Sequence, residues 1–205
     1  MDIDGFWDLI ERSERETDTK RERVAWLEEH LFGLSVEEIV DFDVFWTIAT
    51  NRACSWDMYA LYRHMLSSYS SDGFEYFVNW LVGLGREAFE TIADCPDRAV
   101  EVPQVRRVLE LQRSAFNGSR RRREVWTEEE YPEFESLGYV TREPYEKAAG
   151  ENAISLGQAV VARGVEGKFP WFSFHAEPDG EGWDFEDKAE MVRRLPRTAR
   201  WYGMA

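Results

Sequence analysis

The stretch SSDGFEYFVNWLVGLGREAFE, residues 70–90, determines the fold that the sequence predicts. Asp72 and Glu75 follow a turn-rich start at the spacing of a helix N-cap with its capping box. Large apolar side chains then recur every three or four residues, so they share one face of a helix. These are Phe74, Phe77, Val78, Leu81 and Leu84, with Tyr76 and Trp80 widening the stripe. We therefore expect a central aromatic helix that is buried on almost all sides.

The flanking segments repeat the helical spacing. Capping signals and periodic apolar residues predict helices before residue 70, from Pro103 to Phe116, and near the carboxyl end. Phe169–His175 instead has the period-two alternation of a strand, and Pro170 favours an edge position there. The expected fold class is mainly α: an irregular helical bundle around the central aromatic helix, with at most a small β element near residues 169–175.

One helical domain is expected over residues 1–205, because this length suits a single sizeable core. The clearest shift in composition falls at residues 117–127, where Arg120–Arg123 precedes an acidic run. That stretch predicts an exposed loop or a sub-boundary.

Composition narrows the classes of function. The 40 acidic and 25 basic side chains give a formal net charge of −15, which repels nucleic acids and anionic membranes. Apolar residues make up 43% of the chain, enough for a packed core, and no apolar run could cross a bilayer. The acidic start is unlike a signal peptide, and Cys54 and Cys95 form no paired motif. We expect a cytoplasmic protein with free thiols.

Several motifs of the chain resemble a bacterial family catalogued as domain-of-unknown-function family 4240. The resemblance is best over residues 1–100 and weaker over Tyr139–Gly150 and Arg194–Arg197. It is carried by Phe6-Trp7 with Ile10, by Trp56, and by the string Ser71-Asp72-Gly73-Phe74, Phe77, Trp80-Leu81, Gly85-Arg86 and Phe89. The resemblance implies a mostly helical bacterial protein and carries no activity, cofactor or catalytic residue.

Two local patterns suggest ligand chemistry and lack its usual context. Gly83-Leu-Gly-Arg-Glu-Ala88 fits a dinucleotide fingerprint, but that motif works at a strand-to-helix turn, and no βαβ pattern surrounds it here. A helix bend with Arg86 paired to a carboxylate is the preferred interpretation. His30, His64 and His175 have no metal-ligand spacing, so no metal or cofactor is predicted, although the three could still meet in space.

The only basic patch is Arg120–Arg123, with Arg113 before it and Trp126 after it. Arginine beside an aromatic ring can bind phosphates and stack on bases. Because the chain as a whole is strongly acidic, an exposed loop or a clamp onto an acidic face is preferred over nucleic-acid binding.

Three side chains are candidates for a polar cleft between the aromatic helices: Asp57, Asp72 and Arg86. A buried carboxyl there would have a raised pKa or would hold the arginine in place. This cleft defines one hypothesis, a small-molecule enzyme or an accessory of a modifying pathway. The sequence contains no nucleophile elbow or other catalytic motif that would make an enzyme the first choice.

Tryptophans in loop-like contexts define the leading hypothesis. Trp126, Trp171 and Trp183 are the candidate binding residues, because aromatic side chains are enriched where proteins meet partners. Together with the net charge of −15, they favour a non-enzymatic module that binds a basic protein or peptide.

Overall fold

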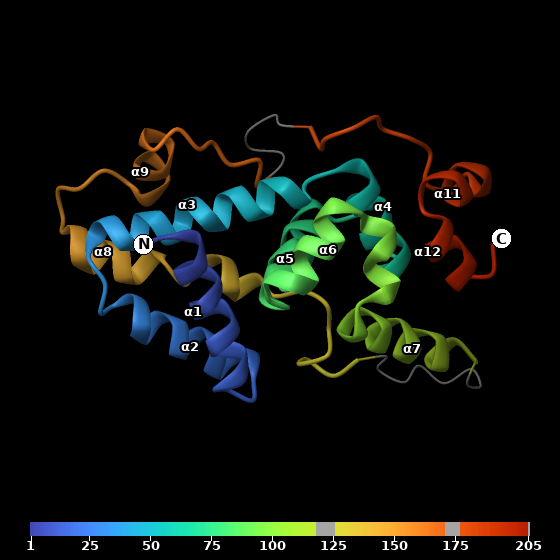
Figure 1. The fold of residues 1–205 in the computed structure, drawn as a ribbon, viewed down its shortest axis with the longest axis horizontal. Helices are drawn as coiled ribbons and strands as arrows, with labels where there is room; N and C mark the ends of the chain where they lie inside the picture. Colours follow the sequence, from blue (N-terminus) through green and yellow to red (C-terminus); the bar gives the residue numbers. More distant parts are fainter. Residues whose placement is uncertain (118–125, 171–176, 205) are drawn as a thin grey trace.

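The structure, a computed structural model, describes residues 1–117, 126–170 and 177–204, without the side chains of 114–117. Helices build this part of the chain, and within it the only β pairing is an isolated bridge between Ser55 and Asp179. The helices form an elongated arrangement, with the amino terminus near one end and the carboxyl terminus at the other (Figure 1). The expectation of a mainly helical fold is confirmed.

Helix α5 (Ser71–Gly83) lies in the middle and is buried along most of its length. Phe74, Phe77, Val78 and Leu81 are fully buried, and each contributes about 1.5–3 kcal/mol by leaving water. Its N-cap is Ser70, whose side chain accepts a hydrogen bond from the Gly73 amide at 3.1 Å. The sequence-based choice of Asp72 as cap was therefore two residues late.

The glycines after α5 end that helix, as their positions predict. Gly85 has a φ of 87°, which only glycine adopts without strain, and α6 (Arg86–Asp94) starts at the next residue. The turn redirects the chain, so the fingerprint-like Gly83–Ala88 segment joins two helices rather than a strand and a helix.

One end of the molecule, beside α5, is built by the amino-terminal helices and by two helices from later in the chain (Figure 1). They are α1 (Ile3–Arg15), α2 (Lys20–Leu31), α3 (Val36–Ala53), α8 (Arg142–Ala149) and α9 (Leu156–Ala162). Capping boxes start α2 at Thr19, α3 at Ser35 and α9 at Ser155. Helix α3 is the long element of this end, and both α8 and α9 pack on it.

The other end contains the remaining helices. They are α4 (Trp56–Leu66), η1 (Pro96–Glu101), α7 (Pro103–Asn117), α11 (Lys188–Arg194) and α12 (Pro196–Trp201). Buried Asp97 accepts hydrogen bonds from the backbone amides of Arg197 and Thr198, both at 2.9 Å. A single carboxylate therefore fastens the start of α12 to η1.

The segment after residue 126 returns along α5 and ends in η2 (Glu135–Tyr139). The Phe134 amide donates to the Tyr76 carbonyl at 2.9 Å, and the Lys20 ammonium donates to the carbonyls of Glu128, Tyr131 and Glu133. The first bond holds the start of η2 against α5, and the Lys20 bonds fasten the preceding residues to α2.

Two sequence-based expectations fall largely outside the described residues. Most of the strand expected at residues 169–175 lies in the segment 171–176, and the loop or boundary expected at 117–127 lies mainly in 118–125. The last helical region is described and is divided, because α11 ends at Arg194 and α12 begins with Pro196.

Candidate functional site

A polar cavity of about 300 Å³ lies between α3, α5, η2, α8 and α9. Its polar wall is formed by Asp43, Glu75, Asn79, Thr141 and Arg142, and its apolar wall includes Trp46, Leu156 and Val160. We call this site the acidic cavity. Apolar walls with a few convergent polar groups are typical of ligand sites, and this volume lies near the small end of their range.

Asp43 is placed on the cavity side of α3, three residues before the buried Trp46. Burial raises the pKa of its carboxyl to about 6, while a hydrogen bond from the Thr141 hydroxyl at 2.8 Å and the charge of Arg142 act against that rise. The side chain keeps some accessible surface, as expected of a group at the wall of a narrow cavity. Asp43 can therefore exchange a proton near neutral pH.

Glu75 and Arg142 are the other charged groups of the wall. Burial raises the pKa of the Glu75 carboxyl, the Asp72 charge adds to the rise, and Arg142 opposes it. The Arg142 guanidinium lies over the Tyr139 ring, 4.0 Å from its centroid. Within residues 1–117, 126–170 and 177–204, no ion pair within 4 Å engages either Asp43 or Glu75.

Asn79 brings an amide into the middle of the apolar helix. The residue is 2% exposed, and its Nδ2 has no hydrogen-bond partner within the described structure. A buried amide hydrogen without a partner costs about 1–3 kcal/mol. Gly138 allows this arrangement, because a Cβ there would meet Asn79 Nδ2 at 2.7 Å. The Asn79 side chain therefore borders the cavity with a donor that no described residue uses.

Together these groups suit a ligand with a positive charge beside a hydrogen-bond acceptor. A carboxyl of the wall, Asp43 or Glu75, could take an ammonium group, the Asn79 amide could donate to a carbonyl oxygen, and Trp46 could pack against an aliphatic group. In the part of the chain that the structure describes, no group of three or more His, Cys, Asp or Glu side chains is arranged to hold a metal ion.

The three residues of the expected cleft have different partners. Arg86 pairs with Asp4 at 2.7 Å and with Glu90 at 3.0 Å, as the preferred interpretation of its motif anticipated. Asp72 is exposed at the start of α5, one helical turn from Glu75, so it contributes its charge to the rim of the acidic cavity. The contacts do not bring Arg86 to either aspartate.

Asp57 instead meets a tryptophan from the carboxyl-terminal part of the chain. Its carboxylate accepts a hydrogen bond from Trp183 Nε1 at 2.9 Å, and Arg194 lies 3.7 Å from the same oxygen. Trp126 also bonds within the molecule, from its Nε1 to the Val108 carbonyl at 3.2 Å. Both tryptophans are partly buried against the core, and each holds a later segment onto an earlier helix.

The histidines and the remaining candidates are placed as follows. His30 stacks on Trp26 at 3.5 Å between ring centroids, and its Nδ1 lies 2.7 Å from the Trp26 carbonyl, whereas His64 lies on α4 at the opposite end of the molecule. Trp171, His175 and Arg120–Arg123 lie outside the described residues.

The described residues define a helical protein with a cavity beside its central helix. The chain is a member of the family described as "Protein of unknown function (DUF4240)", whose model matches residues 1–147. This match confirms the resemblance and covers the whole polar wall of the cavity. A search of curated proteins found no match, and a search of solved structures also found none. Over the described residues, no helix has the length and apolar character needed to cross a membrane.

Proposed function

We propose that the chain is a binding module that takes the amino terminus of a basic protein or peptide into the acidic cavity. The observation that carries this proposal is the wall itself: among the described residues, its two carboxyls have no ion pair and the Asn79 amide has no acceptor. A peptide terminus supplies the complements, an ammonium group and, three bonds away, a carbonyl oxygen. Capture of amino termini by carboxylates and backbone-like donors is a recurring recognition mode.

The charge of the whole chain supports the same partner. A net charge of −15 attracts a basic chain over distances of a Debye length, about 8–10 Å at physiological salt. The cavity would then select the terminus, since its carboxyls lie behind the surface. The proposal includes a cytoplasmic location, because the free thiols of Cys54 and Cys95 suit a reducing compartment.

Leucinamide is the minimal probe, because its ammonium group and carbonyl are spaced as in the first residue of a peptide. Isothermal titration at pH 7 would compare it with N-acetylleucinamide, which lacks the charge, and with a lysine-rich peptide that begins with leucine. We expect the acetylated compound to bind at least about tenfold more weakly, since a charge-assisted hydrogen bond contributes about 1.5–3 kcal/mol. We expect the peptide to bind more tightly than leucinamide.

The matched variants are Asp43→Asn in the cavity and Glu29→Gln on the exposed face of α2, which remove the same charge. The first should weaken leucinamide binding about tenfold, and the second should leave it unchanged. Equal binding of the free and acetylated compounds, or equal effects of the two variants, would contradict the proposal.

A second function is favoured by one observation, the pKa of about 6 for Asp43. A carboxyl that titrates near the working pH can act as a general acid or base, so the cavity also suits a small-molecule enzyme or a pathway accessory. Its test is a metabolite extract incubated with the natural chain and with Asp43→Asn, followed by mass spectrometry. A compound consumed only by the natural chain would favour this function, as would leucinamide binding without any peptide binding.

A further inference from the structure

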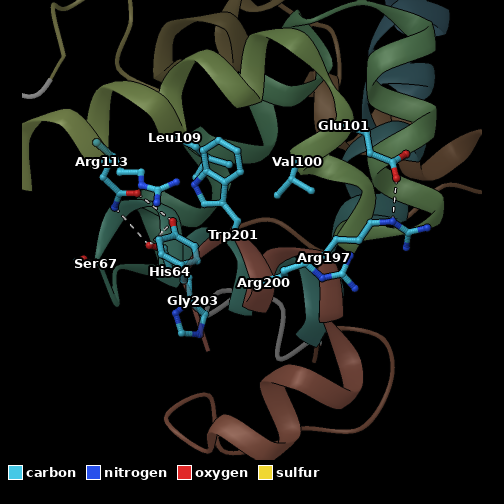
Figure 2. Close-up of a pocket in the computed structure, with 12 residues that line it drawn as sticks. His64, Ser67, Val100, Glu101, Leu109, Arg113, Arg197, Arg200, Trp201 and Gly203 are labelled. Atoms are coloured by element: carbon cyan, nitrogen blue, oxygen red, sulfur yellow. Dashed lines mark hydrogen bonds and ion pairs between the residues drawn. The ribbon is translucent and has the colours of Figure 1, made fainter. Parts of the chain in front are cut away.

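A second cavity, of about 900 Å³, lies at the other end of the molecule between α4, η1, α7 and α12 (Figure 2). We call it the arginine pocket, because Arg113 of α7 and Arg197 and Arg200 of α12 contribute to its wall. Arg113 and Arg197 lie toward opposite sides of the pocket in Figure 2. The concentration of positive charge is unexpected in a chain of net charge −15.

The three guanidinium groups differ in their carboxylate partners among the described residues. Arg197 is held by Asp97 at 3.3 Å and Glu101 at 2.8 Å. For Arg113 and Arg200, by contrast, the described residues provide no carboxylate within 4 Å. Both are exposed at the rim, so they keep their full charge toward the pocket.

The remaining wall contains a flat aromatic face and fixed polar groups. The Arg113 guanidinium lies over the Trp201 ring at 5.9 Å from its centroid. The Tyr202 hydroxyl is fixed between the His64 carbonyl at 3.0 Å and Gln112 Oε1 at 2.9 Å. His64 Nε2, a buried atom of the same wall, has no partner within the described structure. The wall is therefore aromatic on one side and is held in place by hydrogen bonds between α4, α7 and the residue after α12.

We propose that the arginine pocket binds an organic anion in which a phosphate or carboxylate group is joined to a flat ring. Arg113 or Arg200 would contact the anionic group, since the guanidinium fork matches the oxygens of phosphate and of carboxylate. Trp201 would stack on the ring, as aromatic side chains do in nucleotide and aryl-acid sites. The α12 side of this pocket lies beyond the family match to residues 1–147, whereas Arg113 and the α4 and η1 residues of its wall lie within it, and the pocket shares no lining residue with the acidic cavity.

Adenosine monophosphate and benzoate are the probes for the two anionic groups, and adenosine is the uncharged control. Titration calorimetry with the full chain should show binding of at least one anion, with adenosine at least about tenfold weaker than its monophosphate. The double variant Arg113→Gln/Arg200→Gln should weaken that binding about tenfold or more. The double variant Arg21→Gln/Arg193→Gln, which removes the same charge from exposed sites on α2 and α11, should leave it unchanged.

Binding of the monophosphate alone would identify a phosphate ligand, and binding of benzoate alone a carboxylate ligand. The proposal is overturned if neither anion binds at millimolar concentration, or if the two double variants weaken binding equally. The second result would mean that the anions respond only to the overall charge.

Discussion

The helices that line the acidic cavity and those that line the arginine pocket lie toward opposite ends of the molecule (Figure 1). The charged side chains of the two sites differ in sign and in burial. Asp43 and Glu75 are partly buried in the wall of a narrow cavity, and no described residue forms an ion pair with either. Arg113 and Arg200 are instead exposed. When burial disfavours the charge of a carboxyl, its pKa rises and the group can take up a proton. The buried carboxyl is then neutral and costs the fold less free energy. A guanidinium cannot lose its proton in this way and must stay near water or be fully hydrogen-bonded.

Arg23 shows what the burial of a guanidinium group requires. This buried arginine donates to the Ser13 hydroxyl at 2.8 Å and to the Ile10 carbonyl at 2.9 Å, and burial still lowers its pKa to about 10. The comparison implies that the acidic cavity should respond mainly to pH, and the arginine pocket mainly to salt.

Replacing Asp97 with alanine should have the largest effect, and that effect should be confined to the arginine pocket. It removes the acceptor of the Arg197 and Thr198 amides and a partner of the Arg197 guanidinium, so α12 should detach from η1. We expect a loss of about 3 kcal/mol in the free energy of unfolding, measured in urea, and loss of anion binding. Leucinamide binding should persist, and its disappearance would mean that the two ends are coupled. Asp97→Asn retains one acceptor oxygen and should lose less.

Replacing Asp43 with asparagine should remove a pH dependence of stability. Because the folded pKa of about 6 exceeds the ordinary value of 3.8, the native state holds this proton more tightly, and stability falls as pH rises between those values. A difference of about two pKa units corresponds to about 3 kcal/mol, reduced where the carboxyl is partly hydrated. The variant should therefore match the natural chain near pH 4 and exceed it by about 2–3 kcal/mol near pH 7. Parallel urea-denaturation curves at all pH values would contradict this pKa.

Replacing Gly138 with alanine should disturb the acidic cavity without changing any charge. The new methyl group would lie 2.7 Å from Asn79 Nδ2 and would force this buried amide to move, at a cost of about 1–3 kcal/mol. Gly157→Ala is the matched control, since its Cβ would meet nothing within 4 Å on the same cavity wall. Only the first variant should weaken leucinamide binding, and anion binding should be unaffected by both. Equal melting temperatures of the two variants would show that Asn79 moves freely.

Replacing Thr141 with valine should have the smallest effect. Valine keeps the shape of threonine but cannot donate to Asp43, and this bond favours the ionised carboxylate. The pKa of Asp43 should rise further, and stability should fall by about 1 kcal/mol at pH 7. Carbon-detected NMR titration of the Asp43 carboxyl would measure the shift directly. A pKa that does not move would show that the Thr141 hydrogen bond does not favour the ionised carboxylate.

The central helix could be predicted from sequence because its apolar side chains are neighbours along the chain. The spacing of Phe74, Phe77 and Leu81 fixes both the helix and its buried face. The N-cap was assigned two residues late, since Ser70 and Asp72 are both good caps and only the preceding backbone distinguishes them.

The acidic cavity could not be predicted in this way, because its groups come from elements far apart in sequence. Asp43 and Arg142, for example, are brought together only when α8 packs on α3. Two signals were nevertheless present: Asp43 stands between the core residues Phe42 and Trp46, and Asn79 is an amide inside an apolar helix. Polar residues within a buried stripe are where a ligand site should be sought.

The tryptophans illustrate a different limit. The loop-like sequence contexts of Trp126 and Trp183 predict side chains that are available to a partner. In the structure both indole N–H groups donate hydrogen bonds within the molecule. Sequence context predicts that a residue lies outside regular structure, but it does not predict which neighbour covers the ring.

Among the described residues, each of the two pockets has one tryptophan in its wall, Trp46 in the acidic cavity and Trp201 in the arginine pocket. The molecule therefore has a built-in reporter at each site. In a chain labelled with 5-fluorotryptophan, a ligand of the acidic cavity should displace the fluorine resonance of Trp46, and an aromatic anion that of Trp201. One spectrum would then record which end of the molecule an unidentified ligand occupies, and a mixture of two ligands could be resolved without separating them.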